Sequence, residues 1–263
     1  MATGVATLAA ASFAVWIMRL MLGNTLDFTV RQVSLTAVWK GWPFLLLGTL
    51  LGAAGALYNT TIIALLRLAD RFSKRSSVFR AAVIGAVVGV IGWFAPSIIG
   101  GGDNLTQSIL SGRGAVGMLA AVFLLRFFLG PWSYAAGTPG GLFAPLLVLG
   151  ASGGALFGGV MLHFFPALGI TTIACAVVGM GALFSASVRA PLTGIVLTVE
   201  MTGRGDLTLA LLGASLVAMV AAMLLNSEPI YETLKRRCWS SKRRCEENWK
   251  YILYAKRHFC GCS

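Results

Sequence analysis

The amino-acid sequence predicts an all-α integral membrane protein, and three observations lead to this prediction. Hydrophobic residues make up 57% of the chain and charged residues only 11%, whereas about a quarter of an ordinary soluble domain is charged. The mean hydropathy of +0.81 would leave a soluble fold too little polar surface. The apolar residues are gathered in long runs between short polar or glycine-rich connections, as in multi-pass helical proteins.

The basic residues, which give the chain a formal net charge of +12, lie in loops and in the C-terminal tail. We therefore expect them to contact anionic lipid headgroups of the bilayer and not nucleic acid. The loop at residues 67–80 and the tail at residues 237–263 are expected on the cytoplasmic side, because cytoplasmic loops are enriched in Lys and Arg. This predicts a multi-pass protein of the cell's inner or plasma membrane with a cytoplasmic C-terminus.

The first apolar run, residues 1–22, is expected to be a membrane helix. A signal peptide would carry its positive charge before the apolar core, whereas Arg19 follows it. The next helices are expected over residues 42–68, 81–94, 104–110 and 115–129.

Arg126 lies inside the last of these expected helices. A charged side chain is costly at membrane depth, so it should face protein or water. We expect it to pair with structural acceptors; a role in an ion pathway is the alternative.

Residues 137–145 (GTPGGLFAP) form an irregular stretch that opens the apolar run 146–161. Pro145 suits the first turn of a helix, where its missing N–H costs nothing. The first N–H groups of a helix have no internal partner and carry partial positive charge, so this is a candidate anion site. No Lys or Arg lies between Pro131 and Arg189, so an anion would be held weakly enough to leave again. A plain Gly/Pro helix break is the alternative.

Residues 171–184 and 191–201 form two apolar segments, each shorter than the ~20 residues that a full crossing needs. The polar residues 185–190 join them. Such broken helices are tolerated where they are buried in protein or line a cavity, and they build ion sites in transporters. Near the end of the second segment, Glu200 is expected to be a structural carboxylate, with proton transfer as the alternative.

A last apolar segment covers residues 207–225, after which Glu228 and Pro229 favour the first turn of a short helix. Tyr231 lies just inside it. Its hydroxyl is a neutral donor that can hold an anion, and a position at the membrane interface is the alternative. The five cysteines match no standard zinc spacing, and no His/Asp/Ser grouping suggests an enzyme. We therefore expect no catalytic residue, metal or cofactor.

Four short segments, in this order, resemble the signature segments of the CLC family of chloride channels and chloride/proton exchangers. They are residues 100–104 (GGGDN), 140–145 (GGLFAP, similar to GGxFxP), 189–202 (RAPLTG followed by EMT) and 229–231 (PIY). The resemblance covers roughly residues 1–236. It implies a transmembrane domain of tilted and broken helices of the CLC type, followed by the basic tail.

The resemblance also implies a function, chloride transport across a membrane as a voltage-gated channel or as an antiporter that also moves protons. A bound chloride is expected at the backbone N–H groups of Leu142 and Phe143 and at the hydroxyl of Tyr231. The residues expected to support this helix N-terminus are Gly140, Gly141 and Pro145.

The matching segments resemble the second of the two inverted halves of the family fold. The first-half segments GSGIP and GREGP, the latter with the gating glutamate, have no match here. We therefore expect a C-terminal half that acts as a homodimer or with a partner N-terminal half, without proton coupling on its own. The alternative is a truncated, inactive or regulatory half that assembles only with complete CLC subunits. A third hypothesis is an unrelated transporter with broken helices.

Overall fold

The structure, a computed structural model, describes residues 2–23, 27–30, 41–71, 77–96, 99–112, 114–136, 141–237 and 239. Within these ranges every regular element is a helix and no strand occurs, which confirms the all-α prediction. By length and composition, 4 helical stretches in the described part can cross a membrane. They are α2 (Trp42–Arg71), α5 (Val116–Tyr134), α6 (Phe143–Phe164) and Gly205–Leu224, which contains α9 (Thr208–Leu224).

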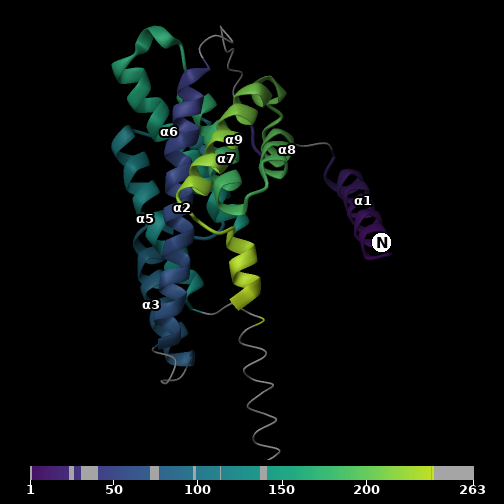
Figure 1. Cartoon of the computed structure of the whole chain (residues 1–263), viewed down its shortest axis with the longest axis vertical. Helices are drawn as coiled ribbons and strands as arrows, with labels where there is room; N and C mark the ends of the chain where they lie inside the picture. Colours follow the sequence, from purple (N-terminus) through teal and green to yellow (C-terminus); the bar gives the residue numbers. More distant parts are fainter. Residues whose placement is uncertain are drawn as a thin grey trace, which may run out of the picture.

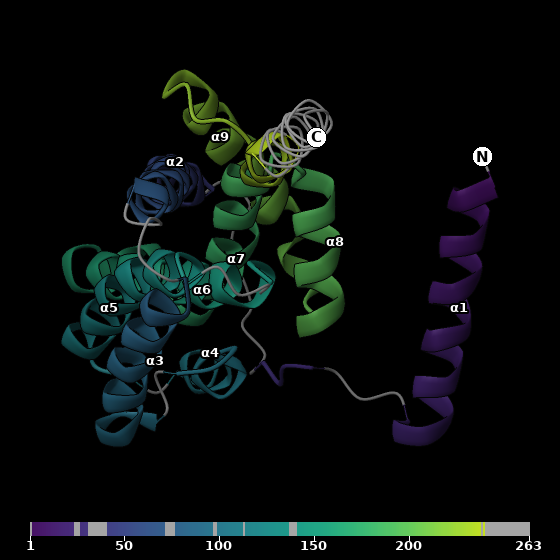
Figure 2. The same cartoon turned by 90° about the horizontal axis from the view of Figure 1, so that it is seen from below.

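The remaining helices are shorter or lie at the edge of the bundle. They are α1 (Ala2–Leu22), α3 (Ser77–Phe94), α4 (Asp103–Leu110), α7 (Thr172–Val188), α8 (Pro191–Thr202) and a helical segment over residues 230–237. The apolar helix α1 stands apart from the others in both views (Figures 1 and 2). Its side chains are exposed from residue 5 to residue 21, so this bundle does not cover them.

The broken-helix region forms the centre of the bundle. All residues of α7 from Ala174 to Ser187 are buried, and α7 packs against α6, α2, α9 and α8. Its crossing with α6 has no room for side chains: a Cβ atom on Gly179 would lie 2.4 Å from the carbonyl oxygen of Gly150. Small residues allow this close backbone approach in a medium where helices associate mainly by packing.

A second close crossing joins α2 to α9. A Cβ atom on Gly48 would lie 2.4 Å from the carbonyl oxygen of Ala214, and one on Gly52 would lie 2.6 Å from that of Ala218. This contact fixes the position of α2, which carries the buried polar residues Tyr58 and Asn59 toward the centre.

Two helices extend further than the sequence suggested. The prediction of a polar turn over residues 185–190 is wrong for residues 185–188, because α7 continues to Val188. The hydroxyl of Ser185 donates to the carbonyl of Gly181 at 2.6 Å, so the serine is satisfied inside the helix. Arg189, with φ 63°, ends α7. Likewise α5 passes through the buried Pro131 to Tyr134, where tertiary packing overrides the local helix break.

Candidate functional site

The predicted anion site lies at the start of α6. This helix begins at Phe143, with Leu142 as the residue before it, and Pro145 lies in its first turn as expected. Leu142 is 3% exposed and Phe143 is half-buried. Gly140 lies outside the described residues. Within the described residues, no acceptor takes the N–H groups of Leu142, Phe143 or Ala144, so these donors are available to a ligand.

Contact with α7 fixes the first turn of α6. The ring of Phe143 packs edge-to-face on that of Phe184, with ring centroids 5.6 Å apart and an interplanar angle of 82°. Such aromatic pairs add specific geometry to apolar burial. The broken-helix region therefore contacts the turn of α6 that carries the N–H donors.

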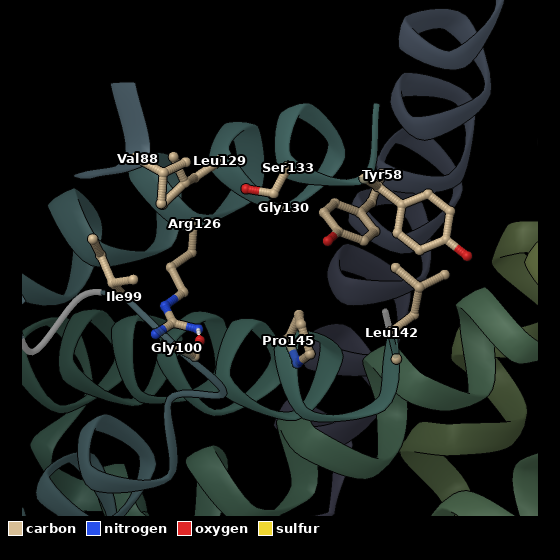
Figure 3. Close-up of a pocket in the computed structure, with 12 residues that line it drawn as sticks. Tyr58, Val88, Ile99, Gly100, Arg126, Leu129, Gly130, Ser133, Leu142 and Pro145 are labelled. Carbon is tan, nitrogen blue, oxygen red and sulfur yellow. Dashed lines mark hydrogen bonds between the residues drawn. The ribbon is translucent and has the colours of Figure 1, made fainter. Parts of the chain in front are cut away.

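A cavity of about 290 Å³ adjoins this helix end (Figure 3). Gly141, Leu142 and Pro145 contribute to its lining from α6 and the residue stretch before it. The polar side chains in its lining come from α2 and α5; they are Tyr58, Arg126, Ser133 and Tyr134. The start of α6 is thus open to a small polar ligand in an otherwise mostly apolar space.

Tyr231, the third predicted chloride ligand, is not among the residues that line this cavity. Its side chain is 44% exposed. Burial raises the pKa of Tyr231, and the neighbouring Tyr134 raises it further. Tyr134 itself lines the cavity, so the Tyr231 phenol lies within electrostatic range of the cavity wall and stays neutral at ordinary pH.

Two side chains that the sequence analysis did not assign to the site hold the chain just before Tyr231. Arg189 donates through Nη2 to the carbonyl oxygens of Ala222, at 3.2 Å, and Ser227. Asn59 donates through Nδ2 to the carbonyl of Ser187 at 3.0 Å.

The same Asn59 amide also donates to the carbonyl of Glu228 at 3.2 Å. Asn59 could have been singled out from the sequence, since it is an amide inside the largely apolar segment 42–68. A buried amide needs hydrogen-bond partners.

Arg126 is 7% exposed and donates through Nη1 to the carbonyl oxygens of Gly100, at 3.3 Å, and Gly101, at 3.4 Å. The expectation that it pairs with structural acceptors is confirmed for Nη1, whereas Nε and Nη2 have no partner among the described residues. The contact joins α5 to the glycine-rich segment before α4.

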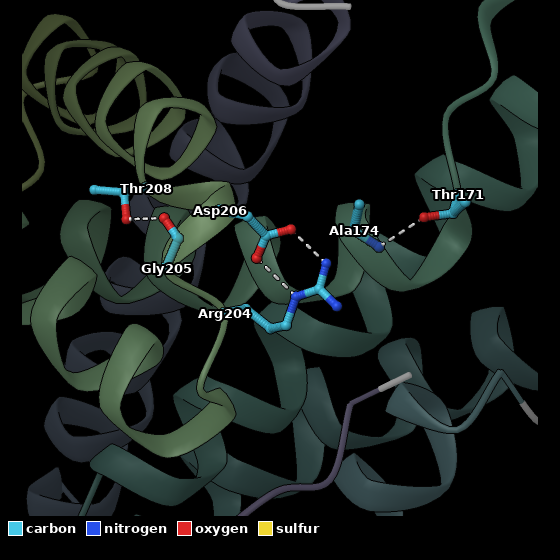
Figure 4. A network of polar contacts seen from close by, with 6 residues as sticks. All are labelled: Thr171, Ala174, Arg204, Gly205, Asp206 and Thr208. Atoms are coloured by element: carbon cyan, nitrogen blue, oxygen red, sulfur yellow. Dashed lines mark hydrogen bonds and ion pairs between the residues drawn. The ribbon is translucent and has the colours of Figure 1, made fainter. Parts of the chain in front are cut away.

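Other candidate polar residues lie away from the cavity. Arg204 is buried and paired with Asp206, its Nε lying 2.9 Å from Oδ1, in the loop between α8 and α9 (Figure 4). Glu200 is exposed and has no hydrogen-bond or ion-pair partner among the described residues, so neither of its expected roles gains support. Cys175 is buried, and the tail cysteines lie outside the described residues.

The comparisons with known proteins agree with the helix arrangement. The sequence model of the voltage gated chloride channel family matches residues 1–223. The H(+)/Cl(-) exchange transporter ClcA of Klebsiella pneumoniae (strain 342) is 37% identical over 227 residues, covering 84% of this chain and 48% of that protein. ClcA of Vibrio cholerae serotype O1 (strain M66-2) is 36% identical over 230 residues, covering 86% and 49%. The chain thus spans about half the length of the curated relatives it matches.

Solved structures show the same similarity. A slow cyanobacterial Cl-/H+ antiporter superposes with a TM-score of 0.82 and 31% identity, covering 88% of this chain and 54% of the other. A eukaryotic CLC transporter gives a TM-score of 0.61 and 27% identity, covering 77% and 35%. These relatives are named as transporters, which agrees with the expectation that the chain is not an enzyme. Because the family match covers most of the sequence and the helices superpose on solved members, the chain belongs to the voltage-gated chloride channel (CLC) family.

Proposed function

We propose that this chain takes part in chloride/proton antiport across a membrane and binds chloride at the N-terminus of α6. One observation carries the proposal: the N–H groups of Leu142 and Phe143 have no acceptor in the described part of the chain and adjoin a cavity. A helix N-terminus with free donors favours an anion. The choice of chloride and protons as the transported ions rests on the relatives that are named as H(+)/Cl(-) exchange transporters.

The hydroxyl of Tyr231 is proposed as a third donor to the ion. Burial and the electrostatic effect of Tyr134, which lines the cavity, both raise the pKa of Tyr231, so its hydroxyl remains protonated at ordinary pH. Gly140, Gly141 and Pro145 are proposed to support the helix N-terminus, because a Gly/Pro stretch allows close approach to the backbone. Donors of partial charge hold the ion without trapping it, which suits transport.

Residues 1–236 are proposed to form the transmembrane unit and residues 237–263 a basic cytoplasmic tail. We propose that the unit acts as a homodimer or with a partner N-terminal half, in the inner or plasma membrane. A truncated, inactive or regulatory half that assembles only with complete CLC subunits is the second candidate.

Calorimetric chloride titration of the purified chain in detergent micelles tests the binding proposal. Tyr231→Phe removes one neutral hydrogen bond, worth about 0.5–1.5 kcal/mol, so affinity should fall roughly three- to tenfold. Leu142→Met, a volume-conserving change of a side chain whose backbone binds the ion, is the matched control and should change affinity little. No chloride binding by the folded wild type would refute the site, and unchanged affinity in Tyr231→Phe would remove Tyr231 from it.

Flux measurements in liposomes separate the two candidate functions. Chloride-driven proton movement is expected when the chain is assembled with an N-terminal half that carries the gating glutamate, and not from this chain alone. A chain that alters flux only when it is mixed with complete CLC subunits would favour the regulatory half.

A further inference from the structure

The helical segment over residues 230–237, which carries Tyr231, is tied to α2 by the arginine at its end. The Nη2 atom of Arg237 donates to the carbonyl oxygen of Leu66 at 2.7 Å and to the carboxylate of Asp70. Arg237 and Asp70 also form an ion pair. The two contacts join residues 171 and 167 positions apart in the chain. A single side chain therefore connects the end of this short helix to the last turns of α2.

The residues of α2 that hold this segment lie on one side of the helix. Leu66 follows Asn59 by seven residues and Asp70 follows Leu66 by four, which is close to two turns and one turn of a helix. Asn59 donates through Nδ2 to the carbonyl of Glu228, at 3.2 Å, just before the short helix begins. Roughly the last three turns of α2 therefore hold the short helix near its start, through Asn59, and at its end, through Arg237.

The side of the short helix that faces the bundle is apolar apart from Arg237. Ile230 is 0% exposed, and Leu234 packs against the core. Since these two residues and Arg237 are four and three positions apart, they lie on one face of the helix. Tyr231 follows Ile230 directly, about 100° round the helix, and is 44% exposed. The direction of the phenol is therefore set by how this face is seated, because the helix turns as a unit.

The preceding arginine makes its ion pair within the same segment. Arg236 pairs with Glu228 at 3.3 Å, and both side chains are more than half exposed. The Arg237 side chain is 27% exposed, and the carbonyl that it contacts belongs to the half-buried Leu66. The pairs with the exposed carboxylates of Glu228 and Asp70 contribute little, whereas a charged donor on a partly buried carbonyl is stronger and fixes geometry. Of the two neighbouring arginines, Arg237 is therefore the one that can orient the short helix.

We propose that Arg237 is a positioning residue for Tyr231. By fastening the end of the short helix to Leu66 and Asp70, it fixes the direction of the Tyr231 side chain, about 9 Å away along the helix axis. The inference rests on the proposed function, in which the Tyr231 hydroxyl binds chloride. Arg237 is not among the residues that line the cavity, so anion affinity depends on a contact outside the site itself.

Chloride titration calorimetry of the whole chain in detergent micelles, at constant ionic strength, tests this role. Arg237→Gln should weaken chloride binding roughly two- to fivefold, because a tilted helix misplaces the phenol but leaves the N–H donors of α6 in place. Arg236→Gln removes the same charge one residue earlier and is the matched control, which should leave the affinity unchanged. Without chloride, amide hydrogen exchange of residues 230–237 should be faster in Arg237→Gln than in the wild type or Arg236→Gln.

Two further measurements separate positioning from a general loss of charge or of folding. The effect of Arg237→Gln on affinity should disappear in a Tyr231→Phe background, since both changes act through the phenol. Asp70→Lys should weaken binding by repelling Arg237, and combining it with Arg237→Glu should restore part of the affinity. The Asp70 side chain is 70% exposed, so Asp70→Lys should fold and decides the question if Arg237→Gln does not fold.

The outcomes distinguish this inference from the proposed function. Unchanged affinity in Arg237→Gln and Asp70→Lys would refute the positioning role and leave the proposed function standing. An equal loss in the Tyr231→Phe background, or equal amide exchange in the three proteins, would do the same. No chloride binding by the folded wild type would refute the proposed function and with it the positioning role, even where faster exchange shows that Arg237 holds the helix.

Discussion

Replacing Asn59 with leucine should weaken chloride binding by loosening the segment that carries Tyr231. Asn59 is 1% exposed, and its Nδ2 atom donates to the carbonyl of Ser187 at 3.0 Å and to that of Glu228 at 3.2 Å. Leucine has a similar volume but no donor. Because Glu228 comes shortly before Tyr231, loss of these bonds should loosen the segment that positions the phenol.

The expected magnitude follows from where the two carbonyls lie. Ser187 is buried, so its carbonyl would lose a partner that water does not replace, costing about 1–3 kcal/mol. Glu228 is exposed, so water replaces the second bond at a cost of about 1 kcal/mol or less. The effect on chloride affinity has an upper limit set by Tyr231 itself. It should not exceed the roughly three- to tenfold loss expected from removing the phenol hydroxyl.

A double-mutant cycle tests whether the effect passes through Tyr231. Chloride affinity is measured by calorimetry for the wild type, Asn59→Leu, Tyr231→Phe and the double variant, and the two effects should not add. Thr60→Val is the matched control on α2, because the Thr60 hydroxyl donates only locally, to the carbonyl of Ala56 at 2.8 Å. If Asn59→Leu weakened binding equally in the wild type and in the Tyr231→Phe background, the reasoning would be refuted.

Three further outcomes are expected. Gly179→Ala should lower the thermal unfolding midpoint, because the added methyl meets backbone of α6 and overpacking costs about 1–3 kcal/mol, whereas Gly85→Ala, with nothing within 4 Å, should not. Thiol labelling should reach Ser77→Cys and the native Cys260 from the same, cytoplasmic side; opposite sidedness would contradict the topology. Deleting residues 238–263 should reduce association with vesicles of anionic lipid but leave chloride affinity unchanged, and a loss of affinity in a folded deletion would show that the tail belongs to the site.

The helices were predictable because long apolar runs and helix breakers are local signals. The position of Pro145 in the first turn of α6 was predicted correctly, because Gly and Pro act on their own stretch of backbone. The end of α7 was missed because the Ser185 hydroxyl is satisfied by the carbonyl of Gly181 inside the helix. The hydrogen-bond partner of a serine cannot be seen in the sequence, so a serine at the end of an apolar run was predicted to lie in a turn.

The candidate site was predictable only in part. The donors at Leu142 and Phe143 follow from helix geometry and from the resemblance to known segments. The bond from Asn59 to Glu228 joins residues 169 positions apart, and the cavity wall combines α2, α5 and α6. Such contacts depend on how the helices pack, which hydropathy and spacing do not specify.

The crossing of α6 and α7 constrains how these two helices can move relative to each other. At Gly150 and Gly179 the two helices touch through backbone atoms, so no side-chain rotamer change can let one slide past the other. Under the proposed function, any motion that exposes the ion to one side of the membrane and then the other is expected to carry α6 and α7 together, with the hinges elsewhere. The N–H donors of Leu142 and Phe143, at the start of α6, would then move with α7 and keep one geometry.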